Sequence, residues 1–232
     1  MRAVFDHPLF FKITVNLKYE LLAVCRCYQD MIYPLLFLIL VIVLFPLSVS
    51  PDPVLLNKIS AGIFWIVVLF LVLLMLDQLF RNDWKEGDLE QLILTPNALS
   101  LAIFIKLLVF CLAISLPLIV MTPFLSLCLY IPIRALKTLC WSIFLGTPSL
   151  IFLGGIARAL TLGLRHSGLL IVLIVIPFYI PVLIFASSAV SFASMGSSAN
   201  GPLAWLSVLM LLSDSLSPLV IRMILRLGIA FV

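Results

Sequence analysis

The chain has 232 residues, of which 64% are hydrophobic and only 10% are charged, and its formal net charge at pH 7 is +4. Its mean hydropathy is +1.32. Soluble domains carry roughly a quarter charged residues on average, so this composition excludes an ordinary soluble protein. A secretory signal peptide would explain one apolar run near the start, whereas apolar runs recur here along the whole chain. The sequence therefore predicts a polytopic membrane protein.

Residues 1–30 precede the first apolar run and have a mixed composition. On a helical wheel their polar side chains gather within about one third of the turn, and apolar side chains fill most of the rest. The polar side chains are Lys12, Asn16, Tyr19, Glu20, Arg26 and Asp30. A helix of this kind can lie in the membrane interface with its apolar side down. We expect such an amphipathic N-terminal helix, and a cytoplasmic helix packed on neighbouring loops is the alternative.

Six later segments are apolar enough to cross a membrane. Crossing the hydrocarbon layer takes roughly 20 apolar residues, and the backbone must satisfy its hydrogen bonds within the segment, so each should be helical. The segments are Met31–Ser50, Ile59–Leu76, a stretch within Leu107–Ile133, Thr138–Ala157, Gly168–Val190 and Leu203–Ile221. The first five contain no charged residue, whereas the sixth contains Asp214 and Pro218. The predicted fold class is an all-α integral membrane protein with six transmembrane helices.

The Lys and Arg residues of the connections indicate the orientation, because cytoplasmic connections carry more of them. Eleven lie on one side of the predicted membrane and three on the other. The eleven are Arg2, Lys12, Lys18, Arg26, Arg81, Lys85, Lys106, Arg158, Arg165, Arg222 and Arg226, and the three are Lys58, Arg134 and Lys137. Both termini are therefore expected in the cytoplasm. A chain with five spans would reduce this bias to nine against five.

The second-to-third connection holds five of the ten acidic residues, namely Asp77, Asp83, Glu86, Asp88 and Glu90. Asp88, with Gln91 three positions later, has the form of a helix N-cap and capping box. Leu89 and Leu92 then supply an apolar side, and Pro96 ends the helix. The pattern fits a short amphipathic helix on the cytoplasmic face and a solvated loop equally well.

Four prolines within the last three spans are expected to shape their helices: Pro148, Pro177, Pro181 and Pro218. A proline removes a backbone donor and obstructs the preceding turn. We expect a kink or break in the fifth span from its two prolines. Asp214 is the single acid within a span and costs a few kcal/mol at mid-bilayer. The sequence favours a structural role at a helix break beside Pro218, and a transport or proton-relay role stays open.

No residue pattern indicates an enzyme or a bound cofactor. The chain contains no G-x-x-x-x-G-K-[ST] phosphate loop, so it is not expected to hydrolyse ATP. Cys25 and Cys27 lack further metal ligands nearby, and the two histidines, His7 and His166, are both predicted in the cytoplasm. The remaining cysteines are interpreted as small apolar residues, with a Cys128–Cys140 disulfide as the alternative.

Several short motifs occur in order along the chain. The run KEGDLEQLILTP at 85–96, with Lys106 beyond it, resembles the coupling loop of type-2 ABC exporter permeases. The others are LFPLS at 44–48, FRND at 80–83, GTP at 146–148, FLG at 152–154, ALT at 159–161 and LIFA at 183–186. Together they resemble the haem exporter protein B family, the membrane subunits of the cytochrome c maturation ABC transporter.

This resemblance implies a type-2 ABC exporter-like fold in a bacterial inner membrane. The predicted domains are a cytoplasmic N-terminal amphipathic helix at 1–30 and a transmembrane domain at 31–232, in which the resemblance makes 77–106 the coupling loop. The expected ATPase-coupling residues are Glu86, Gly87, Asp88, Leu89, Glu90, Gln91 and Leu92. The expected work is export or delivery of haem for c-type cytochromes, or release of a haem-loaded chaperone, driven by ATP on a partner chain. Haem is then the pathway substrate and is not bound by this chain.

The resemblance also implies partners from the same maturation system. They are its ABC ATPase, its haem-handling membrane protein, a further small membrane protein and the haem chaperone. A second copy of this chain is a further possible partner, and nucleic acid is not expected to bind. Two other classes of function stay open: a type-2 permease for a lipid, glycan or drug, and a proton-coupled secondary carrier. Such carriers usually keep several intramembrane ionisable groups and an internal repeat, whereas these spans contain one acid and no evident repeat.

Overall fold

The computed structural model describes residues 28–49, 53–76, 79, 99–161 and 167–229. Every regular element within these ranges is an α-helix. The helices are α2 (Tyr28–Val49), α3 (Pro53–Leu76), α6 (Leu99–Cys128), α7 (Ile133–Leu160), α8 (Ser167–Ser194) and α9 (Asn200–Ile229). All six are long and apolar enough to span a membrane. The predicted all-α membrane fold with six spans is confirmed.

The helices extend beyond the charge-free runs that indicated them. Helix α6 begins at Leu99, before the predicted segment, and so contains Lys106. Helix α9 continues past Ile221 to Ile229 and contains Arg222. Lys and Arg favour helix almost as much as leucine does, and their long side chains can reach the membrane surface from within a helix. A charged residue therefore marks the edge of the hydrocarbon layer more reliably than it marks the end of a helix.

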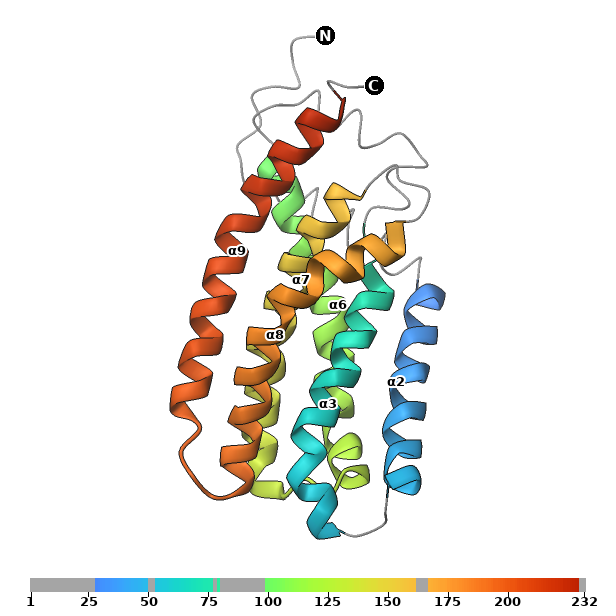
Figure 1. Cartoon of the computed structure of the whole chain (residues 1–232), viewed down its shortest axis with the longest axis vertical. Helices are drawn as coiled ribbons and strands as arrows, with labels where there is room; N and C mark the ends of the chain where they lie inside the picture. Colours follow the sequence, from blue (N-terminus) through green and yellow to red (C-terminus); the bar gives the residue numbers. More distant parts are fainter. Residues whose placement is uncertain (1–27, 50–52, 77–78, 80–98, 162–166, 230–232) are drawn as a thin grey trace.

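Helix α7 lies in the interior of the bundle and α2 lies at its edge. The six helices run alternately up and down the long axis, with α2 beside α3 (Figure 1). Helix α7 packs against α3, α6, α8 and α9, whereas α2 packs against α3 and α6. Of the residues in the membrane-spanning part of α7, 67% are buried within the protein. The corresponding value for α2 is 17%. The core is therefore built around α7, and α2 presents most of its apolar surface outward.

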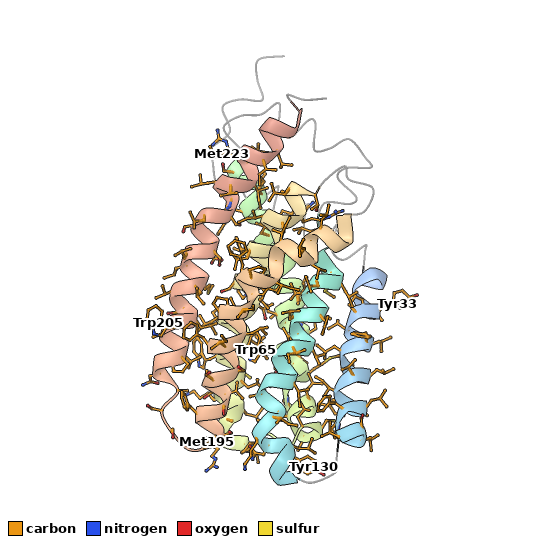
Figure 2. The ribbon with its side chains drawn as sticks, in the orientation of Figure 1. Tyr33, Trp65, Tyr130, Met195, Trp205 and Met223 are labelled. Carbon is orange, nitrogen blue, oxygen red and sulfur yellow. The ribbon has the colours of Figure 1, made fainter. Side chains whose placement is uncertain are left out.

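Two tight turns close one end of the bundle, which we call the turn end. Tyr130 follows the end of α6 in the left-handed region (φ 54°), and Gly196 follows the end of α8 in the same region (φ 79°). The N–H of Ile131 donates to the carbonyl of Ser126 (2.9 Å), and the N–H of Ser197 donates to that of Phe192 (2.9 Å). These are the 6→1 bonds of the Schellman motif, which satisfy the last carbonyls of a helix. Tyr130 and Met195 mark this end in Figure 2.

An arginine links the two turns. The guanidinium of Arg134, in the first turn of α7, donates a hydrogen bond to the carbonyl of Ser194 in the last turn of α8. A cation at a helix C-terminus also interacts favourably with the helix dipole. The start of α7 and the end of α8 are thereby held together. At the opposite end, Nη1 of Arg222 on α9 donates to Oγ of Ser100 on α6 (3.2 Å).

Candidate functional site

In the interior of the bundle, large side chains of neighbouring helices pack directly against glycines of α7. A Cβ at Gly146 would collide with the ring of Trp65 of α3, and a Cβ at Gly154 would collide with Leu76 of α3 and the hydroxyl of Tyr179 of α8. Trp65 and Tyr179 are both 0% exposed. Small residues let transmembrane helices approach closely, and dispersion contacts then hold them together.

The Tyr179 hydroxyl is the polar group at this α7–α8 contact. It donates a 2.6 Å hydrogen bond to the main-chain carbonyl of Leu150. The approach is open because Gly154 has no side chain. Figure 2 shows Trp65 inside the bundle, whereas Tyr33 and Trp205 point outward, where aromatic side chains meet lipid. In the sequence, the two glycines stood out only as letters of the motifs at 146–148 and 152–154. The detectable signal was the spacing of Gly146 and Gly154, which places them two turns apart and near one face.

The four predicted helix-shaping prolines all lie inside continuous helices. Pro148 and Pro218 are buried, and Pro177 and Pro181 are not. Helix α8 has no break, but it changes direction along its length, and its N-terminal part leans across the bundle (Figure 1). The expected break at Pro177 and Pro181 is therefore absent, and the role of these prolines in bending α8 stays a prediction. The helix break expected at Asp214 and Pro218 is absent, because α9 continues through both residues.

Asp214 lies partly buried in α9, and its Oδ1 atom is buried without a hydrogen-bond partner in the described part of the protein. The side chain one turn further, Ser217, is 0% exposed, and its Oγ atom likewise has no partner there. The sequence identified Asp214 by its charge. It gave no sign of Ser217, since a serine in a transmembrane helix usually bonds to its own backbone.

The remaining predicted positions divide into two groups. The ATPase-coupling residues Glu86 to Leu92, the amphipathic segment 1–30 apart from its last residues, and both histidines lie outside the described residues. Cys111, Cys128 and Cys140 are free, so the structure does not contain the alternative Cys128–Cys140 disulfide. Within the described ranges, no three His, Cys, Asp or Glu side chains gather in a way that could hold a metal ion.

Comparisons with known proteins agree with this architecture. The family model described as CcmB protein matches residues 11–228. Heme exporter protein B of Pseudomonas aeruginosa is 41% identical over 196 residues, which cover 84% of this chain and 88% of the relative. The protein of that name from Haemophilus influenzae is 41% identical over 213 residues, covering 92% of this chain and 96% of the relative. The Escherichia coli K12 protein is 38% identical over 212 residues, covering 91% and 96%.

The match runs through all six described helices and is nearly complete on both sides of each alignment. It therefore covers the glycine contacts of α7, the proline-containing helices and Asp214, together with the motifs that suggested the resemblance. A multi-pass helical membrane protein with this match belongs to the CcmB protein family.

Proposed function

We propose that this chain is the membrane subunit of an ABC transporter that exports or delivers haem for the biogenesis of c-type cytochromes. The observation that carries the proposal is the 38–41% identity, over at least 84% of the chain, to proteins named heme exporter protein B. Six membrane-crossing helices suit a permease. The sequence contains no phosphate-binding loop, so ATP hydrolysis is assigned to a separate partner chain.

The packed interior supports a coupling role rather than passage of haem through this chain. Haem iron is held by an axial His, Cys, Met or Tyr beside a shaped pocket. In the bundle, the Tyr179 hydroxyl is engaged with Leu150, and Trp65 fills the notch at Gly146. Neither side chain is placed to hold haem iron, and we therefore propose that ATP drives release of a haem-loaded chaperone from a partner protein. Residues 86–92 would then form the contact with the ATPase, with the haem-handling and small membrane proteins and the haem chaperone as further partners.

The test is to remove the chain from its own bacterium and to restore it with an affinity tag. Haem-attached c-type cytochromes, measured by haem stain, should be lost on removal and return with the tagged chain. An ABC ATPase should co-purify with the tag. The two results separate the alternatives, since a permease for a lipid, glycan or drug would retain an ATPase but leave the cytochromes unchanged. Recovery of the chain without any ATPase would overturn the ABC assignment altogether.

We further propose that the turn end faces outward and that both termini lie in the cytoplasm of an inner-membrane protein. A single cysteine placed at Lys58 or Ser198 should react with a membrane-impermeant maleimide in intact spheroplasts. A cysteine at Lys85 should react only after the membrane is opened. The charge bias of eleven to three is the physical reason. Reaction of the Lys85 position in intact cells would reverse this topology.

A further inference from the structure

The inward side of α9 carries a group of oxygen atoms that lack donors. The Oδ1 atom of Asp214 and the Oγ atom of Ser217 are both buried, with no hydrogen-bond partner in the described ranges. The two residues are three positions apart on one helix, so their side chains lie on nearly the same face. Ile221, one turn further on that face, is 0% exposed and approaches Gly155 of α7. The oxygens therefore point toward protein and not toward lipid.

Ser217 differs from the other serines of its helix. The hydroxyls of Ser207, Ser213 and Ser215 each donate to a carbonyl of α9, at 2.7, 2.8 and 3.1 Å. The Ser217 hydroxyl makes no such bond although it is fully buried. The next residue, Pro218, has no N–H to donate to the main-chain carbonyl of Asp214, which lies four positions before it. A carboxylate oxygen, a hydroxyl and a carbonyl therefore lie within about one turn of α9. The first two have no hydrogen-bond partner in the described part of the chain, and the carbonyl lacks its helical N–H donor.

Helix α6 packs against α9. The two helices run in opposite directions and are joined by the bond from Arg222 to Ser100, so Cys111 of α6, which is 7% exposed, lies near the level of Asp214. Cys111 is therefore a buried polar group of α6 near Asp214, and a thiol carries no positive charge that could pair with the carboxylate.

The remaining charged and titratable groups of the packed helices have interactions of their own. On α6, Lys106 has an interaction of its own, and so does Arg158 in the last turn of α7. On α8, Tyr179 donates to Leu150, and on α9 itself Arg222 donates to Ser100. Neither of these two hydrogen bonds reaches Asp214. A small positive ion is the simplest group that would neutralise the carboxylate.

The chemistry of these atoms identifies the kind of ion. Hard cations prefer oxygen ligands, and membrane proteins bind H⁺ and Na⁺ with a carboxylate and with carbonyls freed from helical hydrogen bonding. An ionisable residue inside a membrane is costly and usually functional. We propose that the α6–α9 junction is a binding site for a small monovalent cation on the Asp214 carboxylate: either H⁺ bound to the carboxylate itself, or Na⁺ with Ser217 Oγ and the Asp214 carbonyl as further ligands. This site goes beyond the proposed coupling function and does not depend on it.

The test uses dicyclohexylcarbodiimide, which modifies protonated carboxyl groups in apolar surroundings, on native membranes that contain the complete complex. Labelling of the Asp214 peptide is measured by mass spectrometry against pH, with NaCl or choline chloride. A proton site should lose labelling by about tenfold per pH unit once most of the carboxyl is ionised, equally in both salts. A sodium site should show lower labelling in NaCl than in choline chloride at the same pH.

Three variants give the test its specificity. Asp214→Asn should abolish labelling of this peptide. Ser217→Ala should shift its dependence on pH or Na⁺, because one ligand is lost. Ser215→Ala is the matched control and should change nothing, since that hydroxyl is exposed and bonded to Leu212. The proposal is overturned if the Asp214 peptide is never labelled, or if its labelling responds neither to pH nor to Na⁺. The readout needs neither ATP hydrolysis nor cytochromes, so it is independent of the proposed transporter function.

Discussion

Gly154→Ala is expected to destabilise the transmembrane bundle by roughly 1–3 kcal/mol, the range for overpacking a dense core. The added methyl group would collide with Leu76 of α3 and with the Tyr179 hydroxyl of α8. Displacement of that hydroxyl would also weaken its bond to Leu150, which contributes about 1 kcal/mol. The measurement is thermal unfolding of the detergent-purified protein, together with its yield from membranes.

Gly62→Ala in α3 is the matched control, because a Cβ at that position meets nothing within 4 Å. The same chemical change should there be neutral or stabilising by up to about 1 kcal/mol, since alanine favours helix over glycine. Adding Tyr179→Phe to Gly154→Ala removes the colliding oxygen and should recover part of the lost stability. Equal unfolding temperatures for the Gly154→Ala and Gly62→Ala proteins would show that Gly154 is not a packing notch.

Replacing both Leu89 and Leu92 with Asp is expected to detach the ATPase and to abolish maturation of c-type cytochromes. If these leucines are the apolar anchors of the coupling segment, each should contribute about 2 kcal/mol or more, which is roughly 30-fold in affinity. Membrane insertion should be intact, because no spanning helix is changed. The measurements are ATPase co-purification and haem-stained cytochromes from the same cells.

Two variants make this second prediction specific to apolar contact. Replacing the same leucines with Met keeps their volume and should retain the ATPase. Glu90→Lys reverses one charge beside them and should weaken coupling more than it weakens folding. Normal cytochromes in the double Asp variant would mean that another segment binds the ATPase, and the coupling role of residues 86–92 would be abandoned.

The number and order of the membrane helices followed from the sequence because the hydrocarbon layer imposes one length and one polarity on every span. The helix ends did not follow in the same way. Lys106 and Arg222 were placed at or beyond the edges of spans, yet both lie within helices. Hydropathy detects the lipid boundary, whereas a helix ends where its backbone hydrogen bonds stop, and those can continue into the interface.

The interior contacts were less predictable for a different reason. Asp214 is unusual within a transmembrane helix and each proline lacks a backbone donor, so their own chemistry singles them out. Gly154 and Tyr179 are ordinary residues whose importance comes from facing each other across α7 and α8, and this depends on helix rotation. The continuity of α8 through Pro177 and Pro181 has the same origin, since neighbouring helices can support a helix whose own ladder lacks donors.

The hydrogen bond from Arg134 to Ser194 has a mechanical consequence. Together with the two tight turns, it fixes the ends of α7, α8 and α9 at one side of the membrane. A force applied at the far ends of these helices would then swing them about that fixed side, as levers about a fulcrum. Small displacements near the turns become larger ones several turns away. If a partner moves the helix ends at the far surface, the displacement would be largest there, between α7 and its neighbours. It would be smallest beside Tyr130 and Gly196.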